Sequence, residues 1–177
     1  MKILSLDISK TGCGMGQGDG SCPPHTSVTS FDQEDVFDAG AAFDRWLTGE
    51  ILNYGPDAIW AEAPLPAAAQ RHTHNSERSI RIQNGLYFIA GTVARKRKIL
   101  FRSVAVSTWR SSFVGKSNPV DPKLATMRMC DLLGWPHGGD DNRADSAGIW
   151  AHAHIKEGNA PGVRQMLSRG SVRRMAG

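Results

Sequence analysis

Acidic residues end two apolar stretches of this 177-residue chain. Asp7 follows the stretch ILSL, residues 3–6, and Glu62 follows AIWA, residues 58–61. Burying an unpaired carboxylate is costly, so each acid needs a partner, a metal or a solvent-filled cleft. If the two stretches are neighbouring parallel strands, both carboxylates lie at the same edge of the sheet, where sites form in α/β folds.

A third acidic region is the segment GGDDNRADSAGIWAHAH, residues 138–154. We expect Asp145 at the border between core and cleft, because the apolar positions that follow it must pack on the sheet. Asp141 lies four residues earlier and Asn142 three residues earlier, so both can face the same side of a helix. Capping the helix and complementing its dipole is the alternative role for Asp140 and Asp141.

Converging carboxylates without an obvious Ser/His/Asp nucleophile favour metal-assisted hydrolysis of a phosphodiester. Hard divalent cations such as Mg²⁺ take several oxygen ligands. We expect two Mg²⁺ (or Mn²⁺) ions about 3.5–4 Å apart to hold the scissile phosphate. Asp7 would bridge the ions, with Glu62 on one and Asp145 on the other. Taken singly, each acid also has an ordinary explanation, as a turn cap or a solvent-facing strand end.

The elements that must position these acids follow from periodicity and breakers. Strands are expected at residues 2–8, 58–61 and 99–106, with a hairpin or meander over 12–31 that turns at GDGSCPP, residues 18–24. Helices are expected at residues 36–54, 76–98, 107–113, 122–134 and 141–157. This order predicts an α/β fold whose mixed sheet is antiparallel at its start and parallel later. From residue 158 the chain has no clear period, so we expect partial disorder.

Composition limits the partners and the compartment. The net charge is +4, with acids gathered in 32–62 and bases in 71–128 and 164–174, which is a weak indication of an anionic partner. No apolar run reaches the roughly 20 residues of a membrane span, and the N-terminus does not read as a signal peptide, so we expect a cytoplasmic protein. Cys13, Cys22 and His25 match no common zinc spacing and lack a fourth ligand, so free thiols are favoured.

The segments LSLDIS, AIWAEAP and NRADSAGIWAHAH resemble, in order and spacing, the RuvC-type Holliday junction resolvases. The similarity runs from about residue 2 to 157 and includes IQNGLYFIAGTVARK and VSTWRSSFVGKSN. It implies a ribonuclease H-like α/β fold, a mixed five-stranded sheet flanked by helices, with one nuclease domain over 1–157 and a basic tail over 158–177. The short meander between Asp7 and Glu62 is closer to a phage-borne version than to a housekeeping bacterial one.

The resemblance also implies an activity. Family members are metal-dependent homodimers in which each subunit nicks one of two symmetric strands of a four-way DNA junction. Their four ligands carry over to Asp7, Glu62, Asp145 and a residue one turn before it. The family usually places that last ligand at the position of Asn142, whereas the nearby acid is Asp141, and we expect Asp141 to act.

Basic residues in two segments are the expected DNA contacts, with ordinary surface charge as the alternative. Arg110, Lys116 and Lys123 resemble the family's phosphate-binding residues, with Arg110 in place of a lysine. Residues 65–81 directly follow Glu62 and are polar and basic, so they could enter the junction. The backbone contacts expected there come from Arg71, Arg78 and Arg81. The wide apolar stripe of residues 80–93 is the expected dimer contact.

Three other functions fit parts of this pattern. An actin-like or sugar-kinase-type ATPase needs two such domains, and this chain has room for one. A related nuclease could act on flaps, D-loops or RNA, because phosphate contacts carry little selectivity for structure. A non-catalytic branched-DNA binder has no reason to hold clustered acids next to a polyanion.

Overall fold

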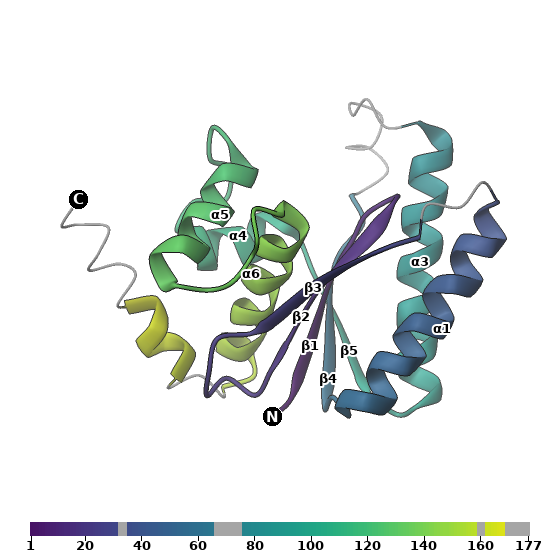
Figure 1. The fold of residues 1–177 in the computed structure, drawn as a ribbon, viewed down its shortest axis with the longest axis horizontal. Helices are drawn as coiled ribbons and strands as arrows, with labels where there is room; N and C mark the ends of the chain where they lie inside the picture. Colours follow the sequence, from purple (N-terminus) through teal and green to yellow (C-terminus); the bar gives the residue numbers. More distant parts are fainter. Residues whose placement is uncertain (32–34, 66–75, 159–161, 169–177) are drawn as a thin grey trace.

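A single mixed sheet organises the computed structural model, which describes residues 1–31, 35–65, 76–158 and 162–168 (Figure 1). Within these ranges the sheet has five strands in the order β3-β2-β1-β4-β5. β2 is antiparallel to both of its neighbours, whereas β1, β4 and β5 run parallel. The strands are β1 (Ile3–Ile8), β2 (Gly12–Gly18), β3 (His25–Ser30), β4 (Ala58–Glu62) and β5 (Leu100–Val104). The predicted mixed five-stranded sheet is therefore confirmed.

Helices cover both faces of this sheet (Figure 1). On one face lie α1 (Val36–Tyr54) and α3 (Glu77–Lys96); on the other lie α4 (Val106–Val114), α5 (Pro122–Leu133) and α6 (Asp141–Lys156). Their ends carry local signals. Four of the helices begin with an N-cap side chain that accepts hydrogen bonds from backbone N–H groups: Asp35 for α1, Ser76 for α3, Asp121 for α5 and Asp140 for α6. Glycines in left-handed conformation end α1, α4 and α5.

Side chains alternate between the two faces of a sheet, so the strands contribute to two separate apolar cores, one on each face. In β1, Leu4 and Leu6 belong to the core under α1 and α3, whereas Ile3 belongs to the core under α4, α5 and α6. In β4, Ala58 and Trp60 also belong to the second core. The same alternation directs Asp7, the second-last residue of β1, and Glu62, the last residue of β4, toward the α6 side.

The chain beyond α6 differs from the prediction in one place. Residues 162–168 are helical, and Val163 is fully buried in the core on the α6 side, with Met166 and Leu167 packed against it. Met166 and Leu167 follow Val163 by three and four residues, so the three form a short apolar stripe of helical period, which the prediction did not include. The other residues of the predicted tail, 159–161 and 169–177, lie outside the described residues. None of the described helices is long and apolar enough to cross a membrane.

Candidate active site

Asp7 and Glu62 lie level with each other on the face of the sheet that α6 covers. Leu6 of β1 pairs in parallel with Ala61 of β4, so the next residue of each strand lies at the same height. Both acids end runs whose alternate members, Ile3 and Trp60 among them, are buried under α6. Two carboxylates thus meet at the carboxyl ends of adjacent parallel strands, as the sequence predicts.

Glycines on β2 let the start of α6 approach these acids closely. Gly14 pairs with Asp7, and a Cβ on Gly14 would lie only 2.1 Å from the backbone oxygen of Asn142. One turn further along, Ser5 donates a hydrogen bond of 2.8 Å to the backbone oxygen of Ser146. Helix and strand therefore pack backbone against backbone, and the first turns of α6 bring Asp141 and Asp145 beside the strand ends.

The four carboxylates influence one another. Burial raises the pKa of Asp7 well above its ordinary value, and the charges of Glu62, Asp145 and Asp141 raise it further. Burial also raises the pKa of Asp145, to about 7, with Arg110 opposing the effect. For Glu62, burial raises the pKa, and the hydrogen bond from the Trp109 indole lowers it. Like charges held together in a poorly solvated site favour the binding of a cation.

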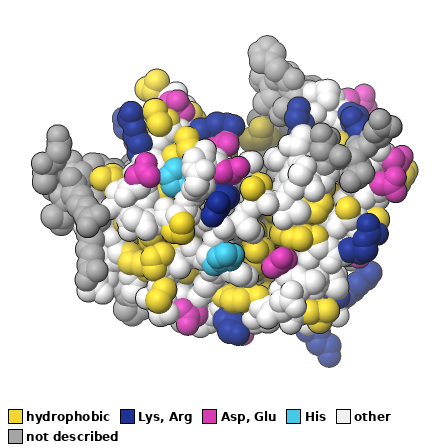
Figure 2. Space-filling model, viewed as in Figure 1, with side chains coloured by type: hydrophobic (Ala, Val, Ile, Leu, Met, Phe, Trp, Pro, Cys, Tyr) yellow, Lys and Arg dark blue, Asp and Glu magenta, His cyan; other side chains and the backbone are white. Residues whose placement is uncertain are grey.

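Basic side chains contact two of these acids. Arg110 of α4 lies 3.6 Å from Asp145, and only 12% of its side chain is exposed. Lys123, at the start of α5, contacts the carboxylate of Asp141. In Figure 2, acidic and basic side chains lie close together over α5 and the start of α6. The cations offset part of the repulsion among the acids.

The donor set fits a hard divalent ion. All the acids offer oxygen, and within the described part of the chain the buried Oδ1 atom of Asp145 has no hydrogen-bond partner. Over the described ranges, no three His, Cys, Asp or Glu side chains are grouped tightly enough to hold one ion as they stand. Arg110 and Lys123 lie against the Oδ2 atoms of Asp145 and Asp141, respectively.

The fourth ligand has two candidates in the first turn of α6. Asp141 acts electrostatically on both Asp7 and Asp145. The Asn142 Cβ lies 3.1 Å from where a Cβ on Gly14 would be, so Asn142 packs beside the strand partner of Asp7. Asp140 has the capping role, because its side chain accepts a hydrogen bond from the backbone N–H of Arg143 at the start of α6.

The remaining basic residues predicted to bind DNA lie on other segments of the chain. Lys116 is exposed in the loop that follows α4. Arg81 and Arg78 lie on α3, which covers the other face of the sheet, and Arg81 forms an exposed ion pair with Glu77. Arg71 lies outside the described residues, as does most of the predicted junction-entering loop. Among the described basic residues that were predicted to bind DNA, Arg110 and Lys123 are those seen in contact with the carboxylates.

Sequence reasoning missed the role of Trp109. Its indole Nε1 donates a hydrogen bond of 2.7 Å to Oε2 of Glu62, and its side chain is fully buried. The available signal was its place directly before Arg110 in VSTWRSSFVGKSN.

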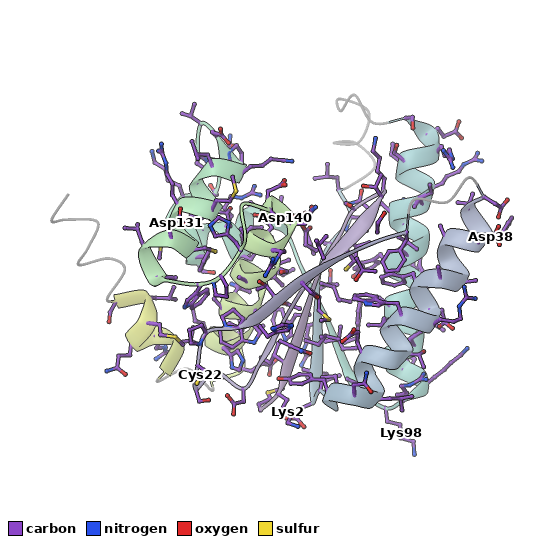
Figure 3. The ribbon with its side chains drawn as sticks, in the orientation of Figure 1. Lys2, Cys22, Asp38, Lys98, Asp131 and Asp140 are labelled. Carbon is purple, nitrogen blue, oxygen red and sulfur yellow. The ribbon has the colours of Figure 1, made fainter. Side chains whose placement is uncertain are left out.

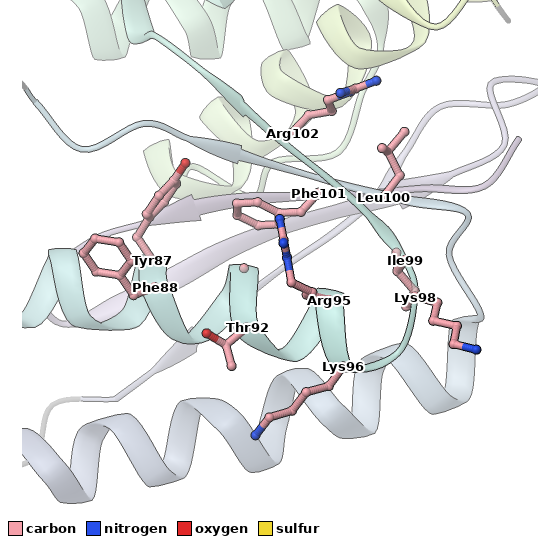
Figure 4. Close-up of a pocket in the computed structure, with 11 residues that line it drawn as sticks. Tyr87, Phe88, Thr92, Arg95, Lys96, Lys98, Ile99, Leu100, Phe101 and Arg102 are labelled. Carbon is pink, nitrogen blue, oxygen red and sulfur yellow. The ribbon is translucent and has the colours of Figure 1, made fainter.

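A pocket of about 620 Å³ between α3 and β5 offers a different chemistry (Figure 4). Its charged lining is entirely basic: Arg95, Lys96, Lys98 and Arg102. Lys98 lies at the end of the molecule opposite Asp140 (Figure 3). This pocket therefore provides no ligands for a divalent cation and is separate from the carboxylate site.

Solved structures of two junction resolvases resemble this chain. Thermus thermophilus RuvC matches with 15% identity and a TM-score of 0.66 over 90% of this chain and 98% of that one. The same protein in complex with Holliday junction substrate matches with 14% identity and a TM-score of 0.67 over the same shares. The yeast mitochondrial Holliday junction resolvase Ydc2 matches with 12% identity and a TM-score of 0.53, over 97% of this chain and 82% of that one.

Sequence comparison adds no relative. No protein-family model matches this chain, and no curated protein does. The structural likeness extends along nearly the whole chain, as the resemblance of the three acidic segments predicts. The chain therefore has the ribonuclease H-like fold of the RuvC-type resolvases.

Proposed function

We propose that this protein is a metal-dependent, structure-selective endodeoxyribonuclease that resolves four-way DNA junctions by paired symmetric nicks. One observation carries the proposal. Asp7 and Glu62 lie level at the carboxyl ends of adjacent parallel strands. Burial, and then the charges of Glu62 and Asp145, raise the pKa of Asp7, so the three acids lie close together under α6. A binding protein gains nothing from such a cluster beside a polyanion, because the acids repel phosphates unless a cation is bound.

The residues that would hold two Mg²⁺ or Mn²⁺ ions are Asp7, Glu62, Asp145 and either Asp141 or Asn142. Bound there, the ions would lower the pKa of a water molecule and stabilise the charge on the leaving oxygen. The chain's own contribution is to keep these oxygens in a confined, poorly solvated place at the sheet edge. Because the acids must ionise to bind, loading would release protons.

Arg110 and Lys123 have a second task in this proposal. Each now contacts an acid that would become a metal ligand. With the acids neutralised by bound cations, both basic side chains would be available to hold the phosphates on either side of the cut. They thus keep the acids together in the metal-free protein and grip the substrate in the loaded one.

The proposed active unit is a homodimer, because paired nicks need two active sites. A groove of about 820 Å³ runs between α1 and α3, where Phe37 is 86% exposed and Phe88 is 71% exposed. Contiguous apolar surface rimmed by charge is typical of protein interfaces. This groove includes much of the predicted apolar stripe of residues 80–93 and supports that segment as the contact.

Four-way DNA is favoured over other branched substrates by the fold and by the resemblance of the three acidic segments. One solved structure of similar fold is a complex with Holliday junction substrate. Flaps, D-loops and RNA are the competing substrates, since the acids and bases described above recognise only phosphate.

The test is cleavage of labelled four-way junctions, flaps and linear duplexes with Mg²⁺ or Mn²⁺. We expect symmetric nicks on the junction by the wild type, and a loss of about 10³-fold or more for Asp7→Asn, since metal ions supply several kcal/mol of transition-state stabilisation. The exposed Asp38 on the other face provides the matched control, and Asp38→Asn should leave the rate unchanged. Equal cutting of linear duplex would overturn the resolvase assignment, and an active Asp7→Asn variant would overturn the mechanism.

A further inference from the structure

We infer that Trp109 is a positioning residue that fixes the orientation of Glu62 for metal binding. The inference rests on the proposed function, because it assigns a role toward the ions that Glu62 would hold. Glu62 is the last residue of β4, and Trp109 comes from α4, 47 residues later in the chain. The hydrogen bond of 2.7 Å between the indole Nε1 and the carboxylate Oε2 joins these two elements at the site.

The indole ring is held firmly enough to act as a reference point for the carboxylate. Trp109 has no exposed side-chain surface. A Cβ on Gly148 of α6 would lie 2.7 Å from the ring atom Cζ3 of Trp109 and 3.0 Å from the ring of Phe113. Only a residue without a side chain admits the ring at this place, so α6 is shaped around Trp109.

Helix α4 thus contacts both halves of the carboxylate cluster. Trp109 binds Glu62 from β4, while the next residue, Arg110, pairs with Asp145 from α6. The Arg110 guanidinium also lies over the Trp109 ring, 4.8 Å from its centroid. Both contacts leave one carboxylate oxygen for an ion, since the indole engages only Oε2 of Glu62 and Arg110 lies against Oδ2 of Asp145.

The chemistry of the indole makes this restraint directional. The indole N–H is a donor only, so it binds an ionised carboxylate and cannot compete for a metal. Engaging Oε2 leaves Oε1 as the oxygen that can turn to an ion. Partners that orient a ligand in this way typically contribute 10–100-fold to metal affinity.

The test is a titration with Mn²⁺ alone, in which electron paramagnetic resonance measures free and bound ion in the full-length protein. We expect Trp109→Phe, which removes the N–H, to weaken Mn²⁺ binding by about 10–100-fold. Trp135→Phe is the matched control. Trp135 is also buried in the core on the α6 side and stacks on Phe113, and its Nε1 has no hydrogen-bond partner among the described residues. That variant should leave Mn²⁺ affinity within about threefold of the wild type.

A second measurement separates orientation from packing. In a Glu62→Ala background there is no carboxylate to orient, so adding Trp109→Phe should cause no further loss of Mn²⁺ affinity. An equal loss in both backgrounds would overturn the inference, as would unchanged affinity in the single variant. If Trp109→Phe fails to fold, placing 3-benzothienylalanine at position 109 preserves the ring shape without the N–H, and the same loss is expected. Failure of the proposed function would look different, since Asp7→Asn and Glu62→Ala would then bind Mn²⁺ like the wild type.

Discussion

The two faces of the sheet are packed by different means. Under α1 and α3 the contacts are largely apolar, with Leu4, Leu6 and Phe43 fully buried. Under α6, polar groups join the helix to the sheet. The hydroxyl of Ser5 donates to Ser146, and the indole of Trp150 donates to the backbone oxygen of Gly18 at 3.2 Å. Glycines on β2 bring the two backbones close on this face alone.

This difference indicates on which face of the sheet the position of a helix relative to the strands must be fixed. Apolar contacts tolerate small shifts, because their energy depends on buried area and volume. Hydrogen bonds and backbone contacts fix a helix in register, which a site assembled from two strands and a helix requires. On the face covered by α1 and α3 the helices need not be positioned so closely, and Phe37 and Phe88 stay exposed in a groove. We therefore assign chemistry to one face and association to the other.

Among changes to the packing, the largest effect should come from closing the gap between β2 and α6. In Gly14→Ala the new Cβ would meet the backbone oxygen of Asn142, and neither backbone can move without displacing the strand or the helix. We expect about 1–3 kcal/mol lower stability. Because a misplacement of about 1 Å can lower a rate about 100-fold, we also expect a loss of activity of this order. Chemical denaturation and junction cleavage measure the two; wild-type activity would show that α6 need not approach β2 so closely.

The pH dependence of stability should originate on the α6 face. The folded pKa of Asp145 is about 7, above the ordinary value of 3.8, so its contribution is fully present below about pH 4 and is lost as the pH rises through 7. Without metal, the wild type should lose on the order of a few kcal/mol over this range relative to Asp145→Asn. Urea unfolding from pH 4.5 to 8 measures this difference. Parallel pH profiles for the two proteins would refute the assignment.

Added metal should reverse that trend. Mn²⁺ binds the ionised acids, so it should raise the melting temperature of the wild type at pH 7.5 and have much less effect at pH 5. Asp7→Asn, which removes the proposed bridging ligand, should respond weakly at both values. Differential scanning fluorimetry with and without chelator gives this comparison. An equal shift in both proteins would mean that Mn²⁺ binds elsewhere.

On the other face, a charge should change association and leave the fold intact. Phe88 is 71% exposed in the groove between α1 and α3, so Phe88→Asp removes little buried surface from the monomer. Aromatic residues at an interface often contribute about 2 kcal/mol or more to binding, so the dissociation constant of the dimer should rise at least about 30-fold. Analytical ultracentrifugation measures the constant. Unchanged association would move the dimer contact away from this groove.

The smallest effect is expected from a glycine on α1. A Cβ on Gly49 would meet nothing within 4 Å, so Gly49→Ala should stabilise the fold by about 0.5–1 kcal/mol through helix propensity. Denaturant unfolding measures this gain, and nuclease activity should not change. A loss of stability comparable to that of Gly14→Ala would show that the two faces do not differ as described.

Local patterns were sufficient for most of the fold. The stretch from residue 36 to 54 forms α1 as predicted, because its apolar spacing, its N-cap and Gly55 all favour one helix. Short continuous apolar runs likewise placed Asp7 and Glu62 at strand ends. The helix at 162–168 was missed because its stripe is short and becomes meaningful only against the core that buries Val163.

The candidate site was only partly predictable. Three acids could be named from sequence because each stands at the end of a patterned element. The choice among basic residues could not, because Arg110 and Lys116 lie in one short segment and only the first reaches an acid. The fourth ligand also depends on how α6 is rotated over β2, which the spacing of Asp141 and Asn142 leaves open.

By itself, the sequence determined which elements form, where the strands end and which acids are available, since neighbours a few residues apart control these features. Only the tertiary structure decided how near α6 comes to β2, that Trp109 donates to Glu62, and that Arg110 and Lys123 hold the acids. Those outcomes depend on distances between segments remote in the chain, which packing sets to a fraction of an ångström and local patterns do not encode.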